Sequence, residues 1–124
     1  MRTTLVVDAA NVIGSRPDGW WKDRAGAAGR LHAALVAAGA QWDHVILVLE
    51  GRARAGVPEG STGHVTTVHA AASGDDELVA QCQASTEAGD EVTLATADRG
   101  LLARVDRLGP GVLGPRTLRD ALGH

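Results

Sequence analysis

Short apolar runs alternate with longer amphipathic stretches along the chain. The runs cover residues 3–8 (TTLVVD), 44–50 (HVILVLE), 64–69 (HVTTVH) and 91–96 (EVTLAT), and a short fifth is GVLG. The first, second and fourth are nearly continuous in apolar residues, which is typical of strands in a sheet covered on both faces. The pattern therefore predicts four strands and a short fifth.

The stretches between these runs follow the period of helices. Residues 23–38 are expected to form a helix that Gly39 closes. Ser73 is expected to begin another helix, with Asp76 three residues later as its capping box and Gly89 at its end. The apolar stripe of the first helix is formed by Ala28, Leu31, Leu35 and Ala38.

Two shorter helices are expected over residues 99–107 and 116–122, the last with Pro115 in its first turn. Residues 51–63 form the one long loop of this interpretation, and the sequence shows no repeat and no interdomain linker. Alternation of strands and helices predicts a single α/β domain over residues 1–124, built in three layers around a mostly parallel sheet.

Composition supports this architecture. A chain of 124 residues can bury the core of one domain, and without Phe or Tyr that core must consist of aliphatic side chains. The one cysteine, Cys82, suits a reducing compartment, and the apolar run before Asp8 is too short for a signal peptide or a membrane span. We therefore expect a cytoplasmic protein with no membrane contact. A net charge of −3 argues against a strongly basic nucleic-acid wrapper.

Five acidic residues are expected near one edge of the sheet. Asp8 and Glu50 end the first two strands, Asp98 lies two residues past the fourth, and Asp75 and Asp76 begin the helix before it. Parallel strands connected by right-handed crossovers bring their carboxyl ends to the same edge, where ligands bind. The sequence therefore predicts an acidic crevice there.

Each acid also has a purely structural interpretation. Asp75, Asp76 and Asp98 could cap helices or complement their dipoles, and Glu50 could be a loop residue facing water. A helical wheel of roughly 100° per residue places Asp75 on the apolar axis, so Asp75 is expected to face the sheet edge and Asp76 to be the cap. The residues that define this axis are Leu78, Val79, Cys82 and Thr86.

Crowded carboxylates repel one another unless they take up protons or bind a cation. Oxygen ligands without an accompanying Cys or His pattern select Mg²⁺ or Mn²⁺ over zinc, and the five histidines show no ligand spacing. Mg²⁺ in such pockets usually takes further ligands from substrate phosphate. The acidic crevice therefore indicates phosphoryl chemistry.

Three segments, VVDAANVIG, SGDDELV and ATADRGL, resemble in order and spacing the PIN-like nucleases, and most closely their bacterial NYN-type branch. The resemblance spans nearly the whole chain and implies strand order 3-2-1-4-5 and a metal-dependent ribonuclease. The chain departs from the family at Glu50, where members of the branch often carry Asp. The matching positions are Asp8, Asn11, Asp75 or Asp76, and Asp98, with Thr96 and Arg99 beside them.

The resemblance also implies roles for these residues. Asp8, Asp75 and Asp98, with Asp76 as the alternative to Asp75, would hold one or two ions that activate water for phosphodiester hydrolysis. Asn11 would hold a phosphate oxygen or a metal-bound water. RNA is the expected partner, and a homodimer or a protein partner stays open. The candidates for gripping the strand are Thr96, Arg99, Arg52, Arg54 and Arg16.

Single residues bear on the role of the tryptophans and on other classes of protein. Trp20 and Trp21 could stack on a base, but packing of one or both against the fold is favoured. A haloacid-dehalogenase phosphatase would need an acid where Ala10 stands, and a receiver domain would need a lysine after a late strand. Both classes are disfavoured. A non-catalytic RNA-binding or partner-binding domain with the same fold is the stronger rival to a nuclease.

Overall fold

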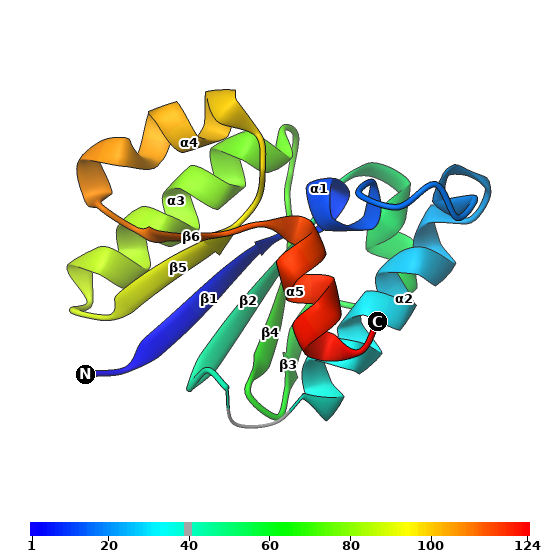
Figure 1. The fold of residues 1–124 in the computed structure, drawn as a ribbon, viewed down its shortest axis with the longest axis horizontal. Coiled ribbons are helices and arrows are strands. Elements are labelled where there is room, and N and C mark those ends of the chain that lie inside the picture. The colour runs from blue at the N-terminus through cyan, green and yellow to red at the C-terminus, as the bar shows by residue number, and fades with distance from the viewer. Residues whose placement is uncertain (39–40) are drawn as a thin grey trace.

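The computed structural model describes residues 1–38 and 41–124. Within them one six-stranded sheet has the order β3-β4-β2-β1-β5-β6 (Figure 1), and all neighbouring pairs are parallel except β3 with β4. Without β3, this order is the predicted 3-2-1-4-5, which is confirmed. The strands are β1 (Thr3–Asp8), β2 (His44–Leu49), β3 (Gly60–Thr62), β4 (Val65–His69), β5 (Glu91–Ala95) and β6 (Gly111–Leu113).

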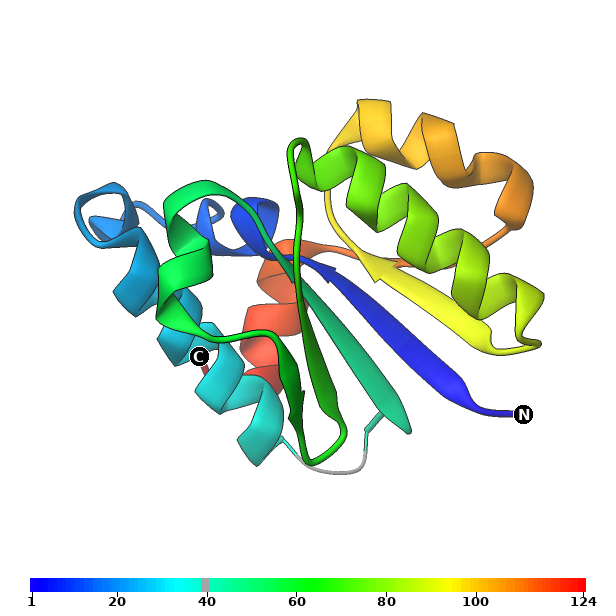
Figure 2. The ribbon, with the colours of Figure 1, turned by 180° about the vertical axis from the view of Figure 1, so that it is seen from behind.

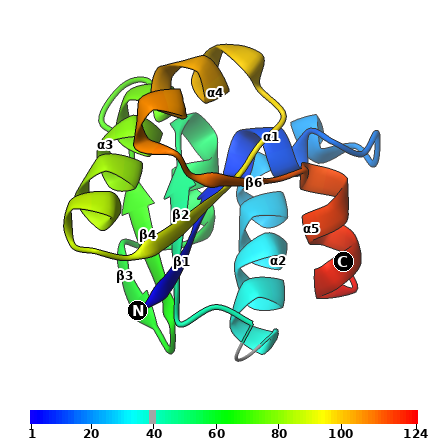
Figure 3. The same ribbon diagram turned by 60° about the vertical axis from the view of Figure 1, so that its left-hand side comes forward.

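Helices cover both faces of the sheet. One face carries α1, α2 and α5, and the other carries α3 and α4 (Figures 1 and 3). The α-helices are α1 (Ala9–Ile13), α2 (Arg24–Ala37), α3 (Gly74–Glu87), α4 (Arg99–Val105) and α5 (Pro115–Leu122). The 3-10 segments are η1 (Trp20–Lys22), η2 (Gly51–Gly56) and η3 (Asp106–Leu108). The three-layer α/β prediction is therefore confirmed.

The apolar run of β1 explains the two cores. Leu5 and Val7 point into the cluster under α1, α2 and α5, whereas Val6 points into the cluster under α3 and α4. All three side chains are fully buried. A strand between two helical layers needs apolar residues at both alternating positions, which is why its sequence reads as a continuous run.

Two elements differ from the predicted outline. Helix α1 follows Asp8 directly, and β3 lies inside the predicted loop of residues 51–63 as an exposed edge strand paired with β4. The same stretch contains η2, which lies beside α2 (Figure 2). The sequences of α1 and β3 show no periodic apolar pattern. The end of the first long helix is given by Ala38 as C-cap, and the predicted closing residue Gly39 lies outside the described residues.

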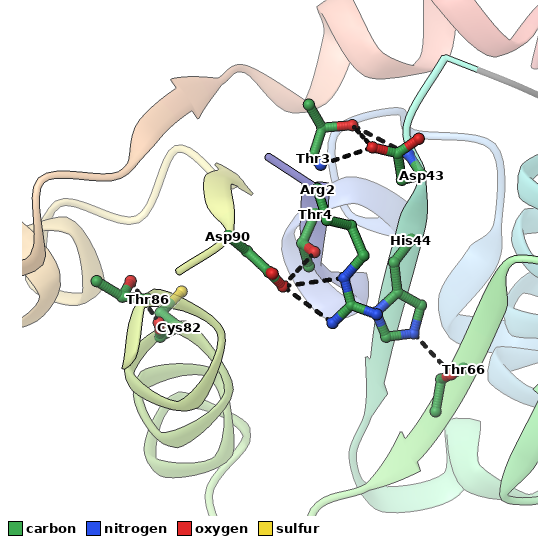
Figure 4. A network of polar contacts seen from close by, with 9 residues as sticks. All are labelled: Arg2, Thr3, Thr4, Asp43, His44, Thr66, Cys82, Thr86 and Asp90. Carbon is green, nitrogen blue, oxygen red and sulfur yellow. Dashed lines mark hydrogen bonds and ion pairs between the residues drawn. The ribbon is translucent and has the colours of Figure 1, made fainter. Parts of the chain in front are cut away.

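Polar side chains pair at the amino ends of the strands (Figure 4). Asp90 accepts hydrogen bonds from Arg2 Nη2 at 3.0 Å and from the Thr4 hydroxyl at 2.9 Å, and Asp43 accepts from the Thr3 backbone N–H at 2.8 Å. Hydrogen bonding to Thr3 lowers the pKa of Asp43, and bonding to Arg2 lowers that of Asp90. At this end of the sheet hydrogen bonds thus outweigh burial, and the charged forms of Asp43 and Asp90 are stabilised.

Candidate functional site

Asp8 ends β1 and is buried, with only 6% of its surface exposed. Its Oδ1 accepts from the Asn11 backbone N–H at 3.4 Å, so that Asp8 is the N-cap of α1. Its Oδ2 accepts from the hydroxyl of Thr96, the buried residue that follows β5, at 2.8 Å. A capping role and a place at the edge of the sheet are thus combined in one carboxylate.

Asn11 and Thr96 link three chain segments around Asp8. Asn11 Oδ1 accepts from the Ala97 backbone N–H at 2.8 Å, which ties α1 to the segment after β5. Thr96 Oγ1 also accepts from the Asp98 N–H at 3.1 Å. These bonds fix the Asp8 carboxylate relative to the start of α4.

Asp98 is the N-cap of α4. Its Oδ1 accepts from the Leu101 N–H at 3.0 Å, as the structural interpretation predicts. The side chain is half-buried, and its Oδ2 accepts no hydrogen bond from residues 1–38 or 41–124. One oxygen of Asp98 is therefore free for a ligand.

Glu50 follows β2 and reaches the amino end of α3. Its Oε2 accepts from the Gly74 N–H at 2.9 Å, and the residue is half-buried, so the interpretation as a loop residue facing water is wrong. A Cβ at position 74 would lie 2.8 Å from Glu50 Cδ. Glycine at this position therefore permits the close approach of the carboxylate.

The adjacent acids of α3 have different surroundings. Asp75 is half-buried, and its backbone N–H donates to Ser73 Oγ at 3.2 Å. Asp76 is 72% exposed at its side chain and forms an ion pair with Arg104 at 2.9 Å. The expected capping box is wrong, because Ser73 caps through Asp75 and the carboxylate of Asp76 is held by Arg104.

Electrostatics connects four of the acids. Burial raises the pKa of Asp8, and the charges of Asp75 and Glu50 raise it further. Burial, followed by the charges of Asp98 and Glu50, also raises the pKa of Asp75. We call Asp8, Glu50, Asp75 and Asp98 the acidic cluster.

The acidic cluster offers only oxygen donors, which fit Mg²⁺ or Mn²⁺. Among the described residues, no three His, Cys, Asp or Glu side chains come close enough to hold a single metal ion as they stand. Burial and neighbouring carboxylates raise the pKa values of Asp8 and Asp75, and a bound cation would offset both effects. The donor chemistry thus fits such an ion, although the side chains have not converged on one point.

Thr96, one of the predicted gripping residues, is buried with its hydroxyl bonded to Asp8, so it is not exposed to grip RNA. The predicted arginines lie in two places. Arg99 begins α4 beside Asp98, and Arg52 is exposed in η2, directly after Glu50. Arg54 Nε donates to the Gly51 carbonyl at 3.0 Å and so also stays beside this edge. Arg16 instead donates to the His124 carbonyl at 2.7 Å, after α5, and is not held at the acidic cluster.

A buried arginine that was not singled out in the sequence supports α1 from the other end. Arg119 of α5 is 4% exposed and donates to the carbonyls of Val12 at 3.0 Å and Ile13 at 3.2 Å. These are carbonyls of the last turn of α1, whose first turn is capped by Asp8. No local pattern could identify Arg119, because its partners lie more than 100 positions earlier in the chain.

A pocket of about 360 Å³ opens beside the acidic cluster. Glu50 lines it together with Trp20 and Arg24, and the Arg24 guanidinium lies over the Trp20 ring at 5.4 Å from its centroid. Trp20 packs against the core, as favoured from the sequence, whereas Trp21 is 51% exposed.

Comparison with known proteins identifies structural relatives. No family model matches the chain, and no curated protein sequence matches it. A crystal structure of Rae1 (YacP) from Bacillus subtilis is similar with a TM-score of 0.77 and 19% identity, covering 99% of this chain and 74% of that one. A point variant of the same protein gives 0.70 and 20%, covering 96% and 74%. This likeness is one of fold, and it agrees with the predicted PIN-like fold.

Proposed function

We propose that this protein is a metal-dependent ribonuclease that hydrolyses RNA phosphodiesters at the acidic cluster. The observation that carries the proposal is the gathering of carboxylates from separate elements at the carboxyl edge of the sheet. These are Asp8 at the end of β1, Glu50 after β2, Asp75 at the start of α3 and Asp98 at the start of α4. The resemblance of three sequence segments to PIN-like nucleases and the structural likeness to Rae1 support this function.

Asp8, Asp75 and Asp98 would hold Mg²⁺ or Mn²⁺ in this proposal. A bound ion of this type supplies an activated water and neutralises charge on the phosphate. Thr96 holds Asp8 in place, and Glu50 adds negative charge beside Asp8 and Asp75. Asp76 is a weaker candidate ligand, since its carboxylate is exposed and paired with Arg104.

Asn11 is proposed to contact the phosphate through its amide NH₂ group. Its Oδ1 already accepts from the Ala97 N–H, so the amide nitrogen is the atom left to donate to a phosphate oxygen. Arg99 and Arg52 flank the acidic cluster and are exposed, as residues that grip an RNA backbone must be. Such local contacts are compatible with a net negative chain.

The test is cleavage of labelled single-stranded RNA with Mg²⁺, with Mn²⁺ and with EDTA, by the wild type and by Asp8→Asn. We expect cleavage only by the wild type with metal. We also expect Mn²⁺ to raise the melting temperature of the wild type more than that of Asp8→Asn, because a ligand that binds the native state stabilises it.

Two other functions have distinct outcomes in the same assay. Gel shift of RNA without cleavage under any metal condition would indicate a non-catalytic RNA-binding domain, which the capping roles of Asp8 and Asp98 would also permit. Phosphate release from small organic phosphates, without RNA cleavage, would indicate a phosphatase.

A further inference from the structure

The pocket beside the acidic cluster is not used by the proposed hydrolysis. Its volume of about 360 Å³ lies in the range of ligand pockets, about 300–1,000 Å³. Glu50 belongs to both the pocket wall and the acidic cluster, and Ala9 and Ala10 of the wall directly follow Asp8. A molecule in the pocket would therefore lie next to a phosphate held at the acids.

Small residues leave the pocket open. The parts of the wall that come from α1, η2 and the segment before α3 expose only methyl groups, backbone and one isoleucine to the pocket. These residues are Ala9, Ala10, Ile13, Gly51, Ala53 and Ala72. Such a surface is apolar and offers room for a flat group.

Trp20 and Arg24 add planar groups to the wall of the pocket. The Arg24 guanidinium lies over the Trp20 ring, 5.4 Å from its centroid, and both residues line the pocket. Unpaired RNA bases are commonly stacked on aromatic rings or on guanidinium planes. The pocket is thus lined both by planar groups and by small apolar residues.

The polar groups of the wall suit a base better than a second phosphate. The Glu50 carboxylate repels an anion, but it can accept from the N–H groups of a base edge, because only its Oε2 is engaged, by the Gly74 N–H. Arg24 can donate to the nitrogen or oxygen acceptors of the same base.

We propose that this pocket binds one unpaired nucleobase of the RNA, that of the nucleotide adjoining the phosphate at the acidic cluster. The proposal rests on the proposed ribonuclease function for the identity of its ligand. It makes Trp20, Arg24 and Glu50 the residues that determine which base adjoins the cleaved bond.

The test is a titration of the metal-free protein in EDTA with each of the four ribonucleoside 5′-monophosphates, followed by ¹H–¹⁵N NMR. Ribose 5-phosphate is the control that lacks the base. We expect at least one nucleotide to shift the Trp20 indole N–H and the amides of Ala9 and Ala10, and ribose 5-phosphate not to do so. Nucleotide shifts confined to other surfaces, or equal shifts with ribose 5-phosphate, would overturn the proposal.

Two adjacent exposed alanines give a matched pair of variants. Ala72 lines the pocket and Ala71 does not. Ala72→Leu should weaken nucleotide binding by about tenfold or more, whereas Ala71→Leu should stay within about twofold of the wild type. Arg24→Gln, at an exposed position, should also weaken binding. Wild-type affinity in both Ala72→Leu and Arg24→Gln would overturn the proposal.

The readouts separate this proposal from the ribonuclease function. RNA cleavage by a protein that binds no nucleotide in the pocket would refute the base pocket alone. Nucleotide binding that Ala72→Leu abolishes, in a protein that never cleaves RNA, would support the base pocket and refute the catalytic function.

Discussion

The hydroxyl of Thr96 donates a hydrogen bond of 2.8 Å to Oδ2 of Asp8 and thereby joins the ends of the adjacent strands β5 and β1. Both residues are buried. This bond lowers the pKa of Asp8 and so opposes the rise that burial causes. Thr96 therefore favours the ionised form of the acid, and the Asn11 N–H acts in the same direction.

The first prediction concerns Thr96→Val, which keeps the side-chain shape and removes the hydroxyl. The pKa of Asp8 should rise further, so that the acid limb of the pH–rate profile for RNA cleavage moves to higher pH. The buried carboxylate and the Asp98 N–H each lose a partner, at a cost of about 1–3 kcal/mol in the free energy of unfolding.

Thr96→Ser provides the control, because it restores the hydroxyl. The pKa of Asp8 in the metal-free protein can be measured from its carboxyl ¹³C shift, independently of activity. An unchanged Asp8 pKa in Thr96→Val would show that the hydroxyl does not tune this acid.

The second prediction concerns the stability of Asp8→Asn. The pKa of Asp8 is raised in the folded protein, so its contribution to stability is fully present below its unfolded pKa and is lost as pH rises through its folded pKa. At neutral pH, Asp8→Asn should remove cleavage but leave the metal-free protein at least as stable, because an amide oxygen can still accept from Thr96. Urea unfolding at acidic and neutral pH measures this, and unfolding of the variant would mark Asp8 as a purely structural acid.

The regular elements could be predicted because their signals are local. The apolar runs of β1, β2 and β5 reflect burial on both faces, and Ser73 and Pro115 mark helix starts at their own positions. Helix α1 is too short to show a helical period, and only its N-cap Asp8 marks its start. Its five residues are stabilised by Asp8 at one end and by Arg119 of α5 at the other.

The candidate site was predictable in its location but not in its contacts. The edge of a parallel sheet gathers strand ends, so the topology alone brings Asp8, Glu50 and Asp98 together. The contact of Glu50 with Gly74 joins residues 24 positions apart and depends on a missing Cβ, which periodicity cannot indicate. The ion pair of Asp76 with Arg104 is nonlocal in the same way.

The third prediction uses this missing Cβ. Gly74→Ala would place a methyl group 2.8 Å from Glu50 Cδ, so the Glu50 side chain must move and its bond to the Gly74 N–H must weaken. The Glu50 carboxylate is the end of a flexible side chain, so the main expected cost is the weakened hydrogen bond, about 0.5–1.5 kcal/mol in the free energy of unfolding. Thermal and urea denaturation would measure it.

Gly29→Ala is the matched control in a helix. Its Cβ would meet only the Gly56 carbonyl oxygen, at 3.6 Å, so alanine should stabilise α2 by about 0.5–1 kcal/mol. A stabilising Gly74→Ala would contradict the tight packing of Glu50 on α3.

The fourth prediction concerns Arg119→Met. Methionine fills much of the same volume but cannot donate to the carbonyls of Val12 and Ile13. The Val12 carbonyl keeps the Ser15 N–H and hydroxyl as donors, whereas the Ile13 carbonyl loses the Arg119 guanidinium. This loss should cost about 1–3 kcal/mol, and hydrogen exchange in α1 should accelerate more than in α3. Arg116→Met, at an exposed position on the same helix, is the control and should leave both quantities near the wild-type values. Equal exchange rates in α1 of Arg119→Met and the wild type would contradict this capping role.

The last prediction compares Asp75 and Asp76 of α3, which are adjacent in the sequence but have different surroundings. Asp75→Asn removes a half-buried carboxylate from the acidic cluster, so metal-dependent cleavage should fall by at least about 100-fold. Because the pKa of Asp75 is raised by burial and by Asp98 and Glu50, loss of its charge should not lower the stability of the metal-free protein at neutral pH. Asp76→Asn loses only an exposed ion pair with Arg104, worth about 0–1 kcal/mol, and should retain cleavage and the rise in melting temperature with Mn²⁺. Parallel measurement of cleavage and melting separates the two residues, because a general effect of surface charge would treat both alike. Loss of cleavage in Asp76→Asn but not in Asp75→Asn would make Asp76 the ligand, and mild effects of both would leave α3 without a part in metal binding.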